Sequence, residues 1–369
     1  MRELVKEREG SSRCGRQKKK KKKKIWLIYG TGQRGARSRY ARTFAREQKT
    51  YSTLRCISTK SEAITMHLLN FKDWTQQQIE EIIDKAIEIK HNPKKWREAL
   101  QDKSLAMIFQ KTSTRTRVSF EVAMTQLGGH AIFLDWRTTN FALADITDET
   151  KYLSRNVDII MARLLRHQDM KTMTQASKVP TINGCDEKYH PCQALADLMT
   201  IEEKKGKLKG LKLVYLGVHN NVCNSLIEAC TLTGIRITTV TPIIHEPALD
   251  KELIEKAKKT GLYETTLDAK KVLKDADIAY TDTWVDMELF QDPKFKEEKE
   301  KRINRMMPYQ INAELMNASS SLIMHDMPIH RGYEISPEMI DAPNSIIFDQ
   351  AENRLHSEKA VLLKLLGKT

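Results

Sequence analysis

The stretch Phe109-Gln-Lys-Thr-Ser113-Thr114-Arg115-Thr116-Arg117 joins a predicted strand to a predicted helix. The apolar segment 104–109 before the loop has the length of a buried strand, and segment 116–127 after it has helical periodicity. Hydroxyl and guanidinium groups alternate between them. Backbone N–H groups and the positive end of the helix dipole favour an anion at such a junction. The stretch therefore predicts an α/β unit that binds a phosphate-like group.

Short apolar strands and amphipathic helices continue to alternate on both sides of this loop. The other predicted strands are 131–134, 158–163, 211–216, 235–240, 278–281, 321–324 and 345–348, and the other predicted helices are 76–91, 191–203, 221–233, 252–260 and 352–366. This alternation is typical of parallel sheets. The 369 residues suggest two domains. We therefore predict an α/β fold with two doubly wound parallel-sheet domains joined by interdomain helices.

The net charge of +14 is concentrated at the N-terminus. Residues 1–65 contain 20 Lys/Arg and 5 Asp/Glu, which gives +15 and leaves −1 for the rest of the chain. Within this segment, 18–24 is an unbroken run of lysines, which is expected to be disordered. The segment is either an organelle transit peptide or sequence upstream of a true start at Met66. Because the residues after 65 are nearly neutral in net charge, we expect no nucleic-acid partner.

A glycine-rich match at 30–35 fits the G-x-G-x-x-G pattern of dinucleotide-binding folds. Such a site needs a complete βαβ unit and an acidic residue about 20 positions further on. The lysine run on one side and the acid-poor segment on the other provide neither. We therefore interpret this match as coincidental and expect no nucleotide cofactor.

Other classes of protein are excluded by what the sequence lacks. The apolar runs are far shorter than the ~20 residues of a membrane helix, so no membrane partner is expected. The six cysteines form no C-x-x-C pair and no metal-type spacing, so we expect buried free thiols and no metal site. No repeat with a period of 20–50 residues is present, which excludes a solenoid.

Four motifs resemble the aspartate/ornithine carbamoyltransferase superfamily, in the order in which that family carries them. They are the loop 113–117 with the Gly128-Gly129 turn, Met161-Ala162-Arg163 at a strand end, His190-Pro191-Cys192-Gln193 at a helix start, and Ala351-Glu352-Asn353-Arg354. The resemblance covers about residues 66–369. It implies an enzyme that transfers a carbamoyl group from carbamoyl phosphate to a small amine acceptor. It also implies a homotrimer, or a multiple of trimers, that needs no cofactor.

The resemblance also assigns the residues that bind and activate the donor. The implied catalytic residues are Arg163, His190, Gln193 and Thr116, and the implied carbamoyl-phosphate-binding residues are Ser113, Thr114, Arg115, Thr116, Arg163, His190, Gln193 and Arg354. Hydrogen-bond donors at the carbonyl oxygen stabilise the negative charge that develops when an amine attacks. Simpler structural roles stay open: Ser113 can cap a helix, and His190 before Pro191 fits a helix start.

The second half is expected to bind the acceptor at the carboxyl ends of its strands. The implied acceptor-binding residues are Asn221, Asp282, Asp286, Met287, Asp326 and Met327. Three of them depart from the ornithine enzymes, which carry a serine where this chain has Asp286, a cysteine where it has Asp326 and a leucine where it has Met327. The two carboxylates either favour an acceptor that is more cationic or has an extra hydrogen-bond donor, or one of them deprotonates the attacking ammonium. The alternative is that they are surface acids in loops.

Because of these departures, we expect the chain to be closest to the YgeW-like putative transcarbamylases, and next to the ornithine carbamoyltransferases. The main hypothesis is carbamoyl transfer to an amino-acid-like amine other than ornithine. The alternatives are ornithine carbamoyltransferase and a non-catalytic relative that binds carbamoyl phosphate. We assign 1–65 to the leader, 66–203 plus 348–369 to the donor domain and 204–347 to the acceptor domain. The expected location is cytoplasmic, or an organelle if the leader is a transit peptide.

Overall fold

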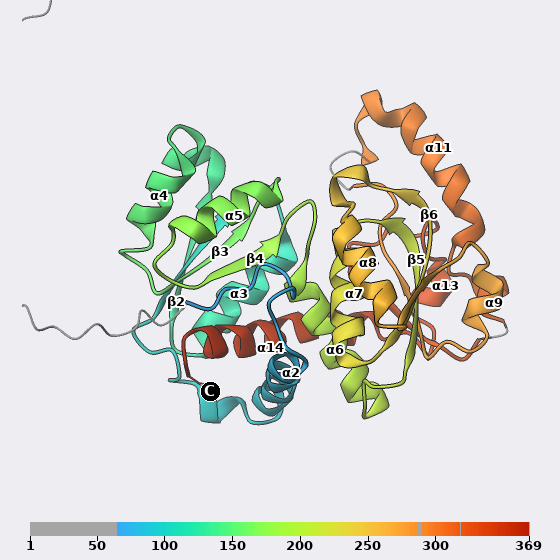
Figure 1. Ribbon diagram of the computed structural model, residues 1–369, viewed down its shortest axis with the longest axis horizontal. Helices are drawn as coiled ribbons and strands as arrows, with labels where there is room; N and C mark the ends of the chain where they lie inside the picture. Colours follow the sequence, from blue (N-terminus) through green and yellow to red (C-terminus); the bar gives the residue numbers. More distant parts are fainter. Residues whose placement is uncertain (1–64, 287–289, 318, 369) are drawn as a thin grey trace, which may run out of the picture. The chain divides into compact units, whose positions relative to one another are not determined.

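The computed structural model describes residues 65–286, 290–317 and 319–368, within a compact unit that spans 64–369. The predicted leader, apart from Thr65, and the predicted acceptor residue Met287 lie outside the described residues. The compact unit contains two parallel sheets, each with helices packed against it (Figure 1). Among the described residues, no helix is both long enough and apolar enough to cross a membrane.

The first sheet has four parallel strands in the order β2-β1-β3-β4. Their bounds are β1 Ser104–Phe109, β2 His130–Asp135, β3 Ile159–Arg163 and β4 Thr181–Cys185. The central strand β1 is apolar and buried from Leu105 onward, because helices cover both faces of the sheet. In register, Phe109 pairs with both Asp135 and Arg163, so these strands end at the same edge.

The second sheet has five parallel strands in the order β7-β6-β5-β8-β9. Their bounds are β5 Lys212–His219, β6 Arg236–Ile244, β7 Tyr263–Thr265, β8 Ile278–Thr281 and β9 Leu322–His325. Thr281 pairs with His325, which brings the segments that follow β8 and β9 together although they lie far apart in sequence.

Helices cover both sheets and connect their strands. Their bounds are α2 Gln76–His91, α3 Thr114–Gln126, α4 Ile146–Leu153, α5 His167–Ala176, α6 Pro191–Lys205, α7 Asn221–Thr233, α8 Lys251–Lys259, α9 Ala269–Leu273, α11 Lys296–Met306, α12 Ala313–Met316, α13 Pro337–Ile340 and α14 Ile347–Leu365. Both sheets have crossover helices on their two faces. The predicted fold class, two doubly wound parallel-sheet domains, is therefore confirmed.

Helices α6 and α14 join the two halves (Figure 1). Helix α6 packs against α7 of the second half, and α14 packs against α2, α3 and α6. A buried polar cluster ties them together: the Asp197 carboxylate in α6 accepts from Gln350 of α14 at 2.7 Å and from the Tyr280 hydroxyl of β8 at 3.1 Å. Burial raises the pKa of Asp197 to about 7.

The strand predicted at 345–348 is wrong. Ser345 forms only an isolated bridge with Ile323, and α14 already begins at Ile347. The run of apolar residues is too short to distinguish a buried strand from a buried helix start by periodicity. Strand β4 was missed, since its Asn183 and Gly184 interrupt the apolar pattern. Helix α3 begins two residues before the predicted start, because Ser113 caps it.

Candidate active site

A cavity of about 450 Å³ lies where strands of both sheets end. In the first half it is lined by the loop after β1, by Arg163 at the end of β3 and by the turn after β4. In the second half it is lined by the segments that follow β5, β8 and β9. Ligands of open α/β sheets bind at the carboxyl ends of the strands, so the position of this cavity is the expected one.

The loop that opens α3 forms one wall of the cavity. Ser113 is the N-cap of this helix, and its hydroxyl accepts from the Thr116 N–H at 3.3 Å. The structural role of Ser113 therefore coexists with its place in the cavity lining. Its O–H remains a donor, because capping uses only a lone pair. Thr116 is 1% exposed, whereas Arg117 is exposed and pairs with Glu121.

Three guanidinium groups line one wall of the cavity, from Arg115 of α3, Arg163 of β3 and Arg354 of α14. Burial lowers the pKa of Arg115, and the Asp326 carboxylate opposes that shift. The buried Arg163 Nε has no hydrogen-bond partner among the described residues. A buried donor of this kind calls for a partner, and an anionic ligand provides one. The converging positive charge suits a phosphate group.

His190 lies beside these arginines and is 6% exposed. Burial lowers the pKa of His190 well below its usual value, and the neighbouring Arg354, Arg163 and Arg115 lower it further. The imidazole is therefore neutral near pH 7. A neutral ring carries one N–H, which can donate to a carbonyl oxygen.

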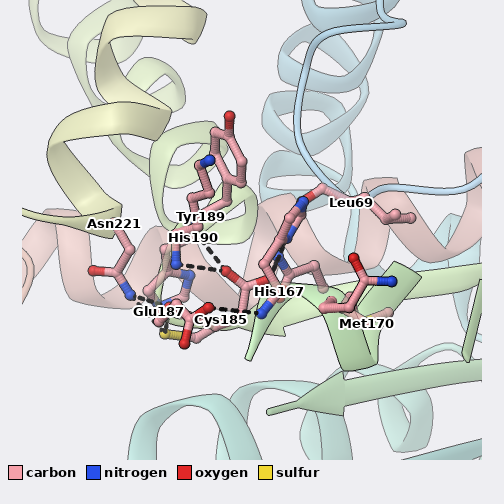
Figure 2. A network of polar contacts seen from close by, with 12 residues as sticks. Leu69, His167, Met170, Cys185, Glu187, Tyr189, His190 and Asn221 are labelled. Atoms are coloured by element: carbon pink, nitrogen blue, oxygen red, sulfur yellow. Dashed lines mark hydrogen bonds and ion pairs between the residues drawn. The ribbon is translucent and has the colours of Figure 1, made fainter. Parts of the chain in front are cut away.

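Figure 2 shows the polar network around the turn that leads into His190, with His167 and Tyr189 beside it. Asp186 holds this turn. Its buried carboxylate accepts from the backbone N–H groups of Lys188 and Tyr189, at 2.8 and 2.7 Å. It also accepts from the Asn183 amide at 2.8 Å and lies 2.7 Å from His167 Nδ1. Both oxygens of the Asp186 carboxylate are therefore paired, and a satisfied buried carboxylate of this kind rigidifies the structure around it.

The second half of the molecule holds the same turn from the opposite side. In α7, the Asn221 amide donates to the Asp186 carbonyl at 2.5 Å, and the Ser225 hydroxyl accepts from the His190 N–H at 2.8 Å. The Tyr189 hydroxyl donates to Asp250, which caps α8. The backbone around His190 is thus fixed by both halves. Asp186 was not predicted as a site residue, although an acid four residues before the motif histidine was a usable signal.

Gln193 is linked to the C-terminal helix. Its side-chain oxygen accepts from Arg354 Nη1 at 2.8 Å, and its amide donates to Asp197 at 2.8 Å. Arg354 Nη2 also reaches the Thr116 hydroxyl, at 3.3 Å, and the Glu358 carboxylate, at 2.8 Å. Glu358 is fully buried, and that burial raises its pKa to about 7. Sequence reasoning missed Glu358, although its i, i+4 spacing from Arg354 was a usable signal.

The wall of the cavity formed by the second half is lined by carboxyl groups. Asp282 and Asp326, which follow β8 and β9, share a hydrogen bond. Burial raises the pKa of Asp282 well above its usual value, and the Asp326 charge raises it further. Burial also raises the pKa of Asp326, but hydrogen bonds to His325 and Asp282 outweigh it and leave that pKa lowered. The pair can therefore hold one proton between two carboxyl groups.

Most of the other predicted acceptor residues also reach the cavity. Asp286, Met327 and Asn221 line it, and Asp286 is exposed. The Asn221 amide is already bonded to the Asp186 turn. Sequence reasoning missed Asn220, which caps α7 and donates to Asp282 at 2.5 Å. Among the other lining residues that were not predicted, four carry a charged or imidazole side chain, namely Lys111, Glu187, His245 and Arg302.

Two parallel-sheet domains that present a wall of arginines and a carboxyl-lined wall to one cavity define a two-domain α/β protein that binds charged ligands where its strands end. Family comparison identifies the class more closely. Residues 66–203 match the carbamoyl-phosphate-binding domain of aspartate/ornithine carbamoyltransferase, and residues 209–365 match its aspartate/ornithine-binding domain. The chain belongs to the aspartate/ornithine carbamoyltransferase family and is a carbamoyltransferase.

Individual relatives agree with this assignment. The chain is 45% identical to an ornithine carbamoyltransferase of Pyrococcus horikoshii over 310 residues, which cover 81% of this chain and 95% of the relative. The structure of the Pyrococcus furiosus ornithine carbamoyltransferase matches with a TM-score of 0.76 and 42% identity, over 82% of this chain and 97% of the other. An acetylornithine transcarbamylase complexed with acetylcitrulline matches with a TM-score of 0.71 and 28% identity, over 81% and 99%. The expected closeness to the YgeW-like branch gains no support from these relatives.

Proposed function

We propose that the chain transfers the carbamoyl group of carbamoyl phosphate to the δ-amino group of ornithine, which yields citrulline and phosphate. The observation that carries the proposal is one cavity in which Arg115, Arg163 and Arg354 face the Asp282–Asp326 pair. The relatives cited above, named as ornithine enzymes, favour this acceptor. The proposal replaces our main expectation from the sequence, an acceptor other than ornithine.

In this proposal the first half holds the donor. Ser113, Thr114, Arg115 and Thr116 bind the phosphate at the start of α3, where backbone N–H groups and the helix dipole favour an anion. Arg354 binds the same phosphate from α14. Arg163 and His190 donate to the carbonyl oxygen, where preorganised donors contribute a few kcal/mol each. Gln193, positioned by Arg354, binds the carbamoyl NH2 group.

The second half holds the acceptor and accepts its proton. The ornithine δ-ammonium gives a proton to the Asp282–Asp326 pair, and the freed nitrogen lone pair attacks the carbamoyl carbon. The bond between that carbon and the phosphate oxygen then breaks, and its electron pair leaves with the phosphate. The phosphate takes the second nitrogen proton, so atoms and charges balance. Asn221, Asp286 and Met327 complete the acceptor wall, and Met287 stays a prediction.

The test is a steady-state assay with carbamoyl phosphate and a panel of amines. The panel contains ornithine, lysine, 2,4-diaminobutyrate, N-acetylornithine and putrescine, and both phosphate and the carbamoylated product are measured. Ornithine is expected to give the highest kcat/KM. A higher value for another amine would contradict the proposal. No turnover with any amine, together with a raised Tm in carbamoyl phosphate, would favour the non-catalytic relative.

One observation favours a second acceptor. Asp286 and Asp326 add carboxyl groups at positions where the resemblance led us to expect neutral side chains, and negative charge favours a diamine. Putrescine is therefore the second candidate, and the same panel separates the two. Assembly as a homotrimer and a cytoplasmic location both stay predictions.

A further inference from the structure

One face of α7 is polar and is turned toward the first half of the molecule. Helical residues at i, i+3, i+4 and i+7 lie on the same face. On this face, the polar side chains that bond to main-chain atoms of the first half are Asn221, Asn224, Ser225 and Glu228. The last three of them are at most 5% exposed. Helix α7 therefore holds the first half through directional hydrogen bonds as well as through packing.

Ser225 contacts His190 directly. Its hydroxyl accepts from the His190 main-chain N–H at 2.8 Å, and the neighbouring Asn224 amide donates to the Lys188 carbonyl at 3.0 Å. The His190 side chain lines the cavity, and its buried Nδ1 has no hydrogen-bond partner among the described residues. The position of the imidazole therefore depends on where the main chain of His190 is held.

The same helix reaches the carboxyl pair at its N-terminus. Asn220, the N-cap of α7, donates to Asp282 at 2.5 Å. Asn220 and Ser225 lie within two turns of each other, and an α-helix has a fixed rise per residue. Helix α7 thus sets the separation between Asp282, which we propose shares the amine's proton, and His190, which we propose faces the carbonyl oxygen.

We propose that Ser225 is a positioning residue for carbamoyl transfer, because it holds the main chain of His190 from the second half of the molecule. This proposal rests on the proposed function and deepens it. A displacement of about 1 Å in a reacting or catalytic group can slow a reaction about 100-fold. The contact of α7 with the first half therefore places the His190 imidazole against the carbamoyl oxygen.

A purely structural role for Ser225 makes a different prediction. Glu228 provides the comparison, since its carboxylate accepts from the Phe71 main-chain N–H at 3.0 Å on the same face of α7. Phe71 precedes α2 and does not line the cavity. If both contacts only fasten the two halves together, the loss of either should lower Tm and leave kcat unchanged. If Ser225 positions His190, only the loss of Ser225 should lower kcat.

The experiment compares Ser225→Ala with its matched control Glu228→Ala. Each change leaves one main-chain N–H of the first half without its acceptor. With both substrates saturating, we expect kcat to fall roughly 10- to 100-fold in Ser225→Ala and to stay near wild type in Glu228→Ala. The Kd for carbamoyl phosphate, measured from its effect on Tm, should change far less, because the phosphate contacts remain. Ser225→Thr keeps the accepting oxygen and should recover most of the kcat.

A second readout needs no acceptor. The His190 donor should polarise the carbonyl bond of isotope-labelled carbamoyl phosphate and lower its infrared stretching frequency in the wild-type complex. In Ser225→Ala the frequency should move back toward that of the free donor, whereas Glu228→Ala should keep the wild-type value. If the wild type prefers an amine other than ornithine, the proposed function fails. The kcat comparison is then made with that amine, and the infrared comparison is unaffected.

A wild-type kcat and carbonyl frequency in Ser225→Ala, or an equal loss of kcat in Glu228→Ala, would overturn the proposal. So would a Ser225→Thr variant that keeps the wild-type Tm but is as slow as Ser225→Ala, because the accepting oxygen would then not matter. If Ser225→Ala does not fold, the same measurements are made on Ser225→Cys, whose sulfur is a weak acceptor. That variant should then lie between the wild type and Ser225→Ala's expected values, and wild-type values would overturn the proposal.

Discussion

Arg354 of α14 donates from Nη1 to the side-chain oxygen of Gln193 at 2.8 Å, across 161 positions of sequence. The last helix therefore orients the residue that we expect to bind the carbamoyl amide. Arg354 is 3% exposed and forms a buried ion pair with Glu358. The Arg354 side chain thus orients a residue of the cavity and also stabilises α14 through its ion pair with Glu358. The two roles can be separated by experiment.

Arg354→Met should lower both activity and stability. It leaves Glu358 buried without a cation, and breaking a buried pair typically costs about 3–5 kcal/mol. The double variant Arg354→Met/Glu358→Leu should recover most of that stability in urea unfolding, because it removes both buried charges. It should stay at least about 100-fold below wild type in kcat/KM. Recovery of activity together with stability would show that Arg354 acts only through packing.

Arg115→Ala should abolish the rise in Tm that carbamoyl phosphate gives to the wild type. A ligand at a hundred times its Kd stabilises a protein by about 2.7 kcal/mol, which scanning calorimetry detects readily. Arg117→Ala is the matched control, because Arg117 is exposed and pairs with Glu121. The control should keep the full shift. A shift that survives Arg115→Ala would contradict the assignment of the phosphate site.

Asp326→Asn should move the acidic limb of the kcat/KM profile to lower pH. A carboxylate that accepts a proton must be ionised, so a raised pKa places the limb at higher pH. The Asp326 charge is one cause of the raised pKa of Asp282, after burial, and its removal lowers that pKa. Asp286→Asn should leave the limb in place. An unmoved limb in Asp326→Asn would rule out the pair as the proton acceptor.

Asp186→Ala should slow the reaction by displacing the His190 turn. The change leaves the Lys188 and Tyr189 N–H groups and the Asn183 amide without their acceptor. We expect the free energy of unfolding to fall by on the order of 3 kcal/mol or more. We expect kcat to fall by at least about 10-fold, which corresponds to about 1.4 kcal/mol at the transition state. Asp186→Asn keeps one of the two oxygens, so this variant should retain a kcat between that of Asp186→Ala and that of the wild type.

The control for this change is Asp169→Ala. Asp169 lies on α5 and pairs with the exposed Arg166 that precedes this helix, and such surface pairs contribute about 0–1 kcal/mol. The stability and the kcat of the Asp169→Ala variant should therefore stay near those of the wild type. If Asp186→Ala loses stability but keeps its kcat, the turn does not position His190.

The convergence of the predicted donor residues on one cavity could be anticipated from the sequence, because these residues lie in short, continuous motifs. The 113–117 loop follows a strand and opens a helix, so local rules place its hydroxyl and guanidinium groups. The pairing of Asp282 with Asp326 needs one more step, the knowledge that β8 and β9 are neighbours. The sequence analysis named both residues but did not predict that they touch.

The residues that were missed depend on contacts between distant segments. Arg302 lies in a helix rich in lysine and glutamate, which resembles an ordinary solvated face in sequence. Only the packing of α11 beside β6 brings its guanidinium to the cavity. Similarly, the role of Asp186 cannot be predicted from the sequence, because it depends on contacts with His167 and Asn183 that form only in the folded chain.

Helix α14 also constrains the order in which a working molecule can be made. Ribosomes deliver the chain from its N-terminus, and N-terminal domains generally fold first. Here the first sheet is synthesised early, yet Arg354 emerges only after every strand of the second sheet. A nascent chain therefore lacks Arg354, which we propose binds the phosphate, while the second half is still being translated. We expect a fragment that ends before α14 to bind carbamoyl phosphate poorly, because one wall of the cavity is missing from it.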